Sequence, residues 1–168
     1  MYRAVNDFLE HWKWESQQMQ AVLDVLTDAS LAQAVIEGHR TLGRMAWHIC
    51  TTIPEMMAHT GLKMEHLVAP DAPVPSTAKE IARAYSVVAK ALADEVAAKW
   101  DDKGLLAEDE LYGERWKRGF TLLVLLKHQI HHRGQMTVLM RQAGLRVPGI
   151  YGPAMEEWAQ YGAPAPEV

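Results

Sequence analysis

The histidines in the second half of the chain carry the clearest chemical signal in the sequence. His128 and His132 stand four residues apart, so in a helix their rings lie on one face, about one turn from each other. Two imidazoles placed in this way can bind one metal ion, and nickel, zinc, iron and copper all accept imidazole nitrogen. Two protein ligands rarely hold a metal ion stably, so this pattern calls for a third ligand from another part of the chain.

The best candidate for the third ligand is His48, near the middle of a predicted helix over residues 41–60. At about 100° per residue it falls on the shoulder of that helix's apolar stripe, from where it can point into a cleft between helices. Three histidines with one or two open positions are typical of catalytic rather than structural metal centres. The predicted metal ligands are therefore His48, His128 and His132. The remaining histidines fit the role less well, because they lie off this face, in loops or at helix ends: His11, His39, His59, His66 and His131.

Other metal and nucleophile chemistries fail on residue type. A zinc metalloprotease needs the pattern H-E-x-x-H with glutamate as general base, whereas Gln129 occupies the glutamate position here. A di-iron carboxylate bundle needs Glu-x-x-His on two helices, and the chain offers no convincing pair. Cys50 has no identifiable catalytic partner, and a lone cysteine is more often a buried structural residue. Gln135, one turn beyond His132, either hydrogen-bonds a histidine ring or a metal-bound water, or is a polar residue at a helix contact.

The elements that must position these residues are helical. Apolar periodicity predicts four long helices, over residues 3–28, 41–60, 77–100 and 120–143, and a short fifth helix between Pro153 and Gly162. Thr41 is the expected N-cap of the second helix, and a capping box opens the third helix at Thr77. Pro54 is expected to kink the second helix or to end it near Ile53. Residues 101–119 are predicted to form a loop with a short extended piece.

Two features of these helices leave alternatives open. Glu15 and Ser16 interrupt the apolar stripe of the first helix, either because they lie at its edge or because they form a polar spot that faces a buried site. The helix over residues 120–143 is apolar over most of its circumference, which is typical of a helix buried on several sides. We therefore expect it to contact both its own bundle and a partner subunit.

Connection lengths predict the order in which the helices run. Residues 61–76 can span roughly 50 Å when extended, and a helix of 20 residues is about 30 Å long. That connection is long enough to run the length of the bundle and to leave the second and third helices parallel. The expected fold is all-α, a four-helix bundle of up-down-down-up topology with a short C-terminal helix, in a single domain over residues 1–168.

Composition limits the partners. The 168 residues are 49% hydrophobic and 23% charged, which excludes a disordered, collagenous or filamentous chain and fits one soluble globular domain. The net charge of −4 gives no support to nucleic-acid binding. The single cysteine, the N-terminus without a signal-like apolar run and the lack of a membrane-length apolar run predict a cytoplasmic protein that binds neither nucleic acid nor membrane.

The histidine motifs resemble those of the DinB family. The resemblance rests on His48 within residues 42–49 (LGRMAWHI) and more strongly on residues 128–135 (HQIHHRGQ). The family's hallmark is His-x-x-x-His, often with the second histidine inside His-His-Arg-Gly-Gln. The likeness covers nearly the whole chain, and residues 147–153 and 156–158 also resemble the tail of many members.

This resemblance implies an up-down-down-up four-helix bundle, commonly a homodimer. It also implies a divalent metal ion (nickel, zinc or iron) on His48, His128 and His132, with solvent completing the coordination. Characterised relatives are transferases that use low-molecular-weight thiols, together with a thiol-dependent maleylpyruvate isomerase. The implied function is metal-dependent thiol S-transfer to a small electrophilic substrate, with the metal lowering the pKa of the bound thiol.

Three alternatives to thiol transfer stay open from the sequence. A metal-dependent hydrolase would activate water at the same open site. A bundle that binds metal without catalysis would close the coordination sphere with a fourth protein ligand. An interaction module would need no metal at all. No catalytic acid or base can be assigned, although Glu15, Glu156 and Glu157 are the carboxylates to consider.

Overall fold

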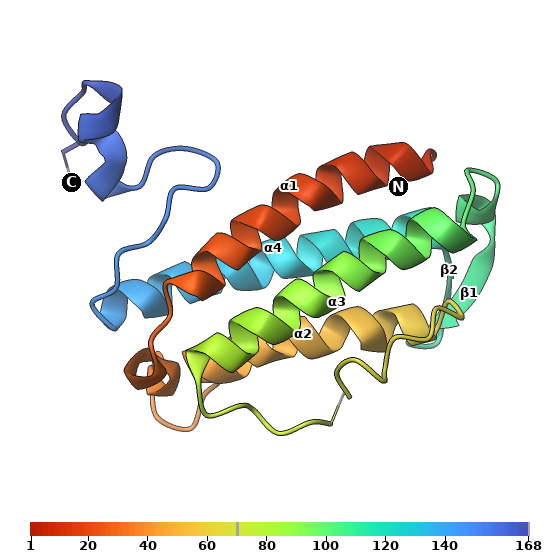
Figure 1. Cartoon of the computed structure of the whole chain (residues 1–168), viewed down its shortest axis with the longest axis horizontal. Coiled ribbons are helices and arrows are strands. Elements are labelled where there is room, and N and C mark those ends of the chain that lie inside the picture. The colour runs from red at the N-terminus through yellow and green to blue at the C-terminus, as the bar shows by residue number, and fades with distance from the viewer. Residues whose placement is uncertain (70, 168) are drawn as a thin grey trace.

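The computed structural model of the chain describes residues 1–69 and 71–167. Four long α-helices lie side by side (Figure 1), α1 Val5–Asp24, α2 Leu42–Ala58, α3 Ala78–Lys99 and α4 Arg118–Gln142. Helix α1 packs against α3 and α4, and α2 packs against the same two helices. The protein is therefore mostly helical, as the periodicity predicts, and each predicted helix overlaps an observed one.

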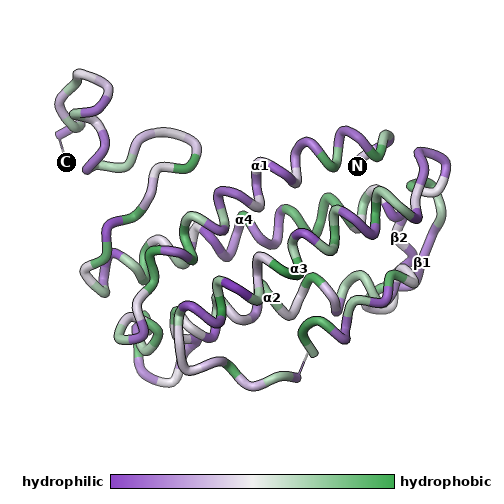
Figure 2. The backbone as a smooth tube through the Cα atoms, viewed as in Figure 1, coloured by the Kyte–Doolittle hydropathy of each residue, from purple (hydrophilic) through white to green (hydrophobic). Residues whose placement is uncertain are grey.

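The core lies where the apolar stripes of these helices meet. Figure 2 shows hydrophilic and hydrophobic residues alternating along all four, as amphipathic helices require. Each helix contributes side chains that are at most 2% exposed, among them Phe8, Trp12, Ile49, Ile53, Val88, Leu92, Leu125 and Leu126. The indole Nε1 of Trp12 also donates a hydrogen bond of 3.0 Å to Ala89 O, which ties α1 to α3.

Side-chain caps determine where α2 and α3 begin. The Thr41 hydroxyl accepts a hydrogen bond from Arg44 N, and the Thr77 hydroxyl accepts one from Glu80 N. Each cap satisfies one of the N–H groups that a helix N-terminus leaves without a partner inside the helix. Both predicted N-caps are therefore confirmed.

Helix α2 does not end near Ile53, so that one of the two outcomes expected for Pro54 is wrong. It continues through Pro54 to Ala58, and Met56 and Met57 beyond the proline are buried. A proline removes one backbone donor from the helix. Here the burial of the last turn against the core offsets that loss and keeps the segment helical.

The prediction of an all-α fold is wrong between α3 and α4. Two strands, β1 Glu108–Leu111 and β2 Glu114–Lys117, pair as an antiparallel hairpin, which Figure 2 shows as largely hydrophilic. The turn residues Tyr112 and Gly113 both have positive φ, 54° and 82°, as a two-residue turn between twisted strands requires. Opposite charges face each other across the ladder, with Glu110 beside Arg115, and such cross-strand pairs stabilise a sheet that has little apolar surface.

The two ends of the chain are held differently. Tyr2 N donates a hydrogen bond of 3.0 Å to Gly119 O, and a Cβ atom at position 119 would lie 2.1 Å from Tyr2 O, so this close approach requires glycine.

Among the described residues, three short 3₁₀ helices lie outside the long helices, η1 Asp28–Ala32, η2 Gly104–Leu106 and η3 Met155–Tyr161. The predicted fifth helix is η3, which has no buried residue and lies to one side of the four long helices in Figure 1. Its Glu156 accepts a hydrogen bond from Arg141 of α4. Within residues 1–69 and 71–167, no helix combines the length and apolar character that a membrane span needs.

Candidate metal centre

The three histidines predicted to bind metal lie together between α2 and α4. His48 Nε2 is 3.2 Å from His128 Nε2, and His132 Nε2 is 3.1 Å from the same atom. One ligand nitrogen from each ring lies within 4.8 Å of the other two. Helix α4 places His128 and His132 on one face because they are four residues apart, and α2 brings His48 to that face from the opposite side.

Hydrogen bonds on the outer side of two of these rings determine where their protons lie. His132 Nδ1 is 2.7 Å from Gln135 Oε1, an oxygen that accepts from the ring in the tautomer that carries its proton on Nδ1. The Thr52 hydroxyl donates its single proton to His48 O at 2.7 Å. Its oxygen therefore accepts a hydrogen bond from His48 Nδ1 at 3.3 Å. Both rings consequently turn an unprotonated Nε2 toward His128.

The ring nitrogens that face one another offer more lone pairs than protons, so a cation can bind them. A neutral imidazole carries one N–H, so His128 Nε2 has at most one proton to offer to the two lone pairs that face it. Nickel, zinc and iron ions accept lone pairs of this kind. The residues present thus fit a metal ion held by three histidines. In the part of the chain that the structure describes, no fourth histidine, cysteine or carboxylate belongs to the cluster.

Burial lowers the pKa of all three rings. The pKa of His48 and of His128 falls to about 4, first because of burial and second because of the positive charge that His132 would carry. Burial also lowers the pKa of His132, although its hydrogen bond to Gln135 acts in the opposite direction. The rings are therefore neutral at pH 7, which is the form that binds metal, so a metal ion need not displace protons from them.

A cavity of about 400 Å³ adjoins His132, and we call it the His132 pocket. It is lined by Val35, His39, Arg40, Met45, His132, Gln135 and Leu139. His39 was expected to be a loop residue without a role, and the sequence analysis did not consider Arg40. Both precede α2 in a segment without helical periodicity, so the sequence gives no signal of which side chains there face the histidines.

Glu15, the polar interruption in α1, lies in a different buried cluster. Glu15 and Arg133 are 0% and 1% exposed, and Glu15 Oε2 is 2.7 Å from Arg133 Nη2. The Tyr151 hydroxyl donates a hydrogen bond of 2.7 Å to Glu15 Oε1. Glu15 therefore does not stand at the exposed edge of its stripe, and its carboxylate contacts Arg133 rather than the three histidines.

The other residues considered from sequence lie outside the histidine cluster. His131 is exposed, and Cys50 is a buried residue whose thiol pKa is raised by that burial. Glu156 accepts a hydrogen bond of 2.9 Å from Arg141, and Glu157 accepts one of 3.0 Å from Gly149 N. These carboxylates hold the C-terminal segment together and none of them belongs to the cluster. Gln135 does hydrogen-bond a histidine ring, which was one of the roles expected for it.

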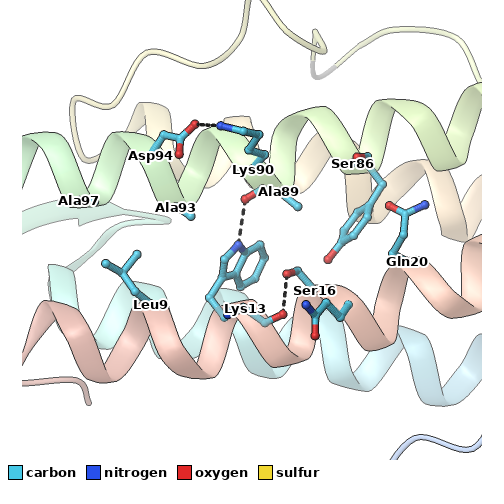
Figure 3. Close-up of a pocket in the computed structure, with 13 residues that line it drawn as sticks. Leu9, Lys13, Ser16, Gln20, Ser86, Ala89, Lys90, Ala93, Asp94 and Ala97 are labelled. Carbon is cyan, nitrogen blue, oxygen red and sulfur yellow. Dashed lines mark hydrogen bonds and ion pairs between the residues drawn. The ribbon is translucent and has the colours of Figure 1, made fainter.

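A larger hollow lies between α1 and α3 (Figure 3), and its chemistry differs from that of the His132 pocket. It has a volume of about 500 Å³, and no histidine lines it. Small side chains of α3 form one side, Ala89, Ala93 and Ala97, facing Leu9 and Ser16 of α1. Nothing in this hollow can bind a metal ion through imidazole or thiolate, so the histidine cluster is the better candidate for a functional site.

Comparisons with known proteins match nearly the whole chain. A protein-family model described as the DinB family matches residues 1–167. The uncharacterized protein YrdA of Bacillus subtilis (strain 168) is 43% identical over 168 residues, which is 100% of both chains. The crystal structure of a DinB-like protein from Bacillus cereus ATCC 10987 matches with a TM-score of 0.86 and 48% identity, over 90% of this chain and 100% of that one. The DinB-like protein YjoA from Bacillus subtilis matches with a TM-score of 0.67 over 86% of this chain and 97% of that one, and at 14% identity it shares the fold.

Proposed function

The chain belongs to the DinB family, and we propose that it binds one divalent metal ion through His48, His128 and His132. We propose further that it is a metal-dependent S-transferase, which joins a low-molecular-weight thiol to a small electrophile. The metal in this proposal is nickel, zinc or iron, because each of these accepts imidazole nitrogen.

One observation carries the metal proposal. The Nε2 atoms of His48 and His132 approach His128 Nε2 at 3.2 and 3.1 Å, and the contacts of Thr52 and Gln135 leave both approaching atoms unprotonated. Histidine ligands of metal ions commonly have their other ring nitrogen held by such a partner, which orients the ring.

The catalytic part of the proposal rests on the number of ligands. Three histidines without a fourth protein ligand among the described residues favour an open coordination position over a closed structural site. What a bound metal ion supplies at such a position is a lowered pKa for a thiol or, in the hydrolase alternative, for a water molecule. The chain itself orients the two rings through Thr52 and Gln135, and the His132 pocket offers space beside them for a substrate.

Metal content is the first test. We would measure it by elemental mass spectrometry on protein purified without a His tag or chelators, in the wild type, His132→Ala and His131→Ala. His131 is the matched control, because it is the neighbouring residue but is exposed and outside the cluster. We expect roughly one metal ion per chain in the wild type and in His131→Ala, and loss of the metal in His132→Ala. A wild type without metal after reconstitution would contradict the proposal.

The product separates thiol transfer from hydrolysis. The metal-loaded protein would be incubated with a small thiol and an electrophile that also has a hydrolysable bond, and the products resolved by mass spectrometry. A thioether that forms only with metal and with intact His132 supports the transferase. A metal-dependent product that has gained water and does not require thiol favours the hydrolase alternative.

We also propose the architecture and assembly that the resemblance implies. The chain would be one domain over residues 1–168 with up-down-down-up helix topology, which is supported by the packing of α1 and α2 against α3 and α4. A homodimer is supported by exposed apolar side chains on α4, since Phe120 is 40% and Val138 is 55% exposed. Light scattering coupled to size-exclusion chromatography measures the molar mass and would contradict the dimer if it gave the mass of one chain.

A further inference from the structure

The His132 pocket has a chemical character that the metal proposal does not explain. Its apolar lining comes from Val35, Met45 and Leu139, and its volume of about 400 Å³ lies in the range of roughly 300–1,000 Å³ that small-molecule sites occupy. One end of the pocket reaches His132, a member of the histidine cluster. The pocket can therefore accept a small ligand with an apolar body that extends toward the cluster.

Arg40 gives this pocket a positive charge. It is the one lining residue that is charged at every physiological pH. Its charge acts on His48, His128 and His132 alike, since it contributes to the lowered pKa of each ring. Within residues 1–69 and 71–167, no carboxylate forms a salt bridge with Arg40.

The buried Arg133 and the half-buried Arg118 are paired with carboxylates, whereas Arg40 is exposed and, like the exposed Arg44, forms no salt bridge among the described residues. Arg133 contacts Glu15 at 2.7 Å and Arg118 contacts Asp109 at 2.8 Å. Both of these arginines have structural partners that account for their positions. Arg40 lines a cavity, where its planar guanidinium would suit a carboxylate.

We propose that the His132 pocket selects small ligands that carry a carboxylate, and that Arg40 is the residue that binds this carboxylate. The apolar body of the ligand lies against the apolar lining, and its other end reaches the histidine cluster. This inference rests on the proposed function, because it names the class of thiol or electrophile that the proposed site accepts. A monoanion is favoured over a phosphate dianion because the pocket lining contains a single permanent charge.

Binding to the metal-free protein tests the role of Arg40 independently of the metal. We would titrate the full chain at pH 7.5 with butanoate and with butanamide, its uncharged isostere, and follow binding by NMR chemical-shift changes. The variants are Arg40→Gln and Arg44→Gln. Arg44 is the matched control, because its substitution removes the same charge one helical turn further on, and it does not line the pocket.

We expect butanoate to bind the wild type about tenfold or more tightly than butanamide, since a charge-assisted hydrogen bond to arginine is lost in the amide. Arg40→Gln should remove this preference, whereas Arg44→Gln should keep it. Equal binding of the two ligands, equal effects of the two substitutions, or tighter binding of inorganic phosphate than of butanoate would each overturn the proposal.

The same titration on zinc-loaded protein separates the two proposals from each other. If the wild type takes up no zinc, the metal site fails while the metal-free titration still decides the role of Arg40. If zinc is bound but butanoate shows no dependence on Arg40 in either form, the carboxylate proposal fails and the metal site stands. Circular dichroism of each variant would establish that it is folded.

Discussion

Helix α4 carries polar side chains on two neighbouring faces, and their polar atoms are satisfied in different ways. We call His128 and His132, with their partner His48 of α2, the histidine stripe, and Arg133 with its partner Glu15 of α1 the arginine stripe. His128 and His132 contact His48 of α2, whereas Arg133, next to His132 in sequence, contacts Glu15 of α1. The arginine stripe, which we call the closed stripe, is paired within the protein, although Glu15 Oε2 forms its ion pair with Arg133 without a hydrogen bond of regular geometry. Arg133 donates to Glu15 O at 3.2 Å and to the Tyr151 hydroxyl at 2.9 Å, beside its 2.7 Å contact with the Glu15 carboxylate.

The histidine stripe is satisfied only in part by the protein. Thr52 and Gln135 occupy the outer nitrogens of two rings, and the inner nitrogens face one another. Buried polar atoms in proteins are nearly always paired with protein, water or a ligand. A polar cluster is therefore a candidate site for an external cation when three ring nitrogens face one another and the ring between the other two has at most one proton to share with them.

The largest expected effect comes from breaking the closed stripe. Arg133→Met should lower the free energy of unfolding by about 3–5 kcal/mol, because it leaves the Glu15 carboxylate buried without a counter-charge. Urea unfolding measures this change. The double variant Glu15→Gln/Arg133→Met should recover part of the loss, since it removes the uncompensated charge. A cost for Arg133→Met below about 1 kcal/mol would show that the two stripes do not differ in the way described.

Metal bound at the histidine stripe should raise the free energy of unfolding. Zinc at about one hundred times its dissociation constant should raise the free energy of unfolding of the wild type by about 2.7 kcal/mol, because only the folded chain presents the site. His128→Ala should lose this increase, and the control His131→Ala should keep it. Urea unfolding with and without zinc gives the comparison, and an equal zinc effect in His128→Ala and in the wild type would exclude the cluster as the binding site.

The part of the molecule that periodicity controls was predictable from the sequence. His128 and His132 share a face because four residues make about one helical turn. Thr41 and Thr77 each precede the apolar stripe of a different helix, and packing did not override these two local cap signals. His48 was predicted from its place on the shoulder of the second helix's apolar stripe, and the family resemblance pointed to it again. Its approach to α4 depends on the packing of two helices, which spacing within one helix cannot describe.

The parts that depend on long-range or irregular contacts were not predictable in this way. Arg40 lies in a connection, where neither the 3.6-residue nor the 2-residue period applies. The partner of Glu15 is Arg133, more than a hundred residues later in the chain, so the sequence showed only that a polar residue interrupts a stripe. The hairpin was predicted only as a short extended piece, because its strands have four residues each and pair charged side chains rather than alternating apolar ones.

Acid should destabilise the metal-free protein through the histidine stripe. The pKa of His48 and of His128 lies at about 4 in the folded chain and near 6.5 when unfolded, so the unfolded state binds more protons between these values. The free energy of unfolding should therefore fall as the pH drops from about 6.5 to about 4. The fall will be smaller than the full shift implies, because both rings are only partly buried.

The variant His128→Gln sharpens this expectation. Its metal-free stability should depend less steeply on pH over the same range than that of the wild type, because one of the two rings with a strongly lowered pKa is gone. Thermal unfolding in chelator at several pH values measures the slopes. Parallel curves for the wild type and His128→Gln would assign the acid sensitivity to other groups.

The smallest predicted effect concerns Tyr151, which links the C-terminal segment to the closed stripe. The residue is 66% exposed, yet its hydroxyl donates to Glu15 Oε1 and accepts from Arg133. Tyr151→Phe keeps the ring and removes both contacts, so it should lower the free energy of unfolding by about 1 kcal/mol. Tyr161→Phe is the control, because Tyr161 is 69% exposed and should change stability by less than about 0.5 kcal/mol. Metal content should be unchanged in both variants, since the closed stripe and the histidine cluster use different residues. If Tyr151→Phe costs no more than the control, the ion pair of Glu15 and Arg133 is complete without the C-terminal segment.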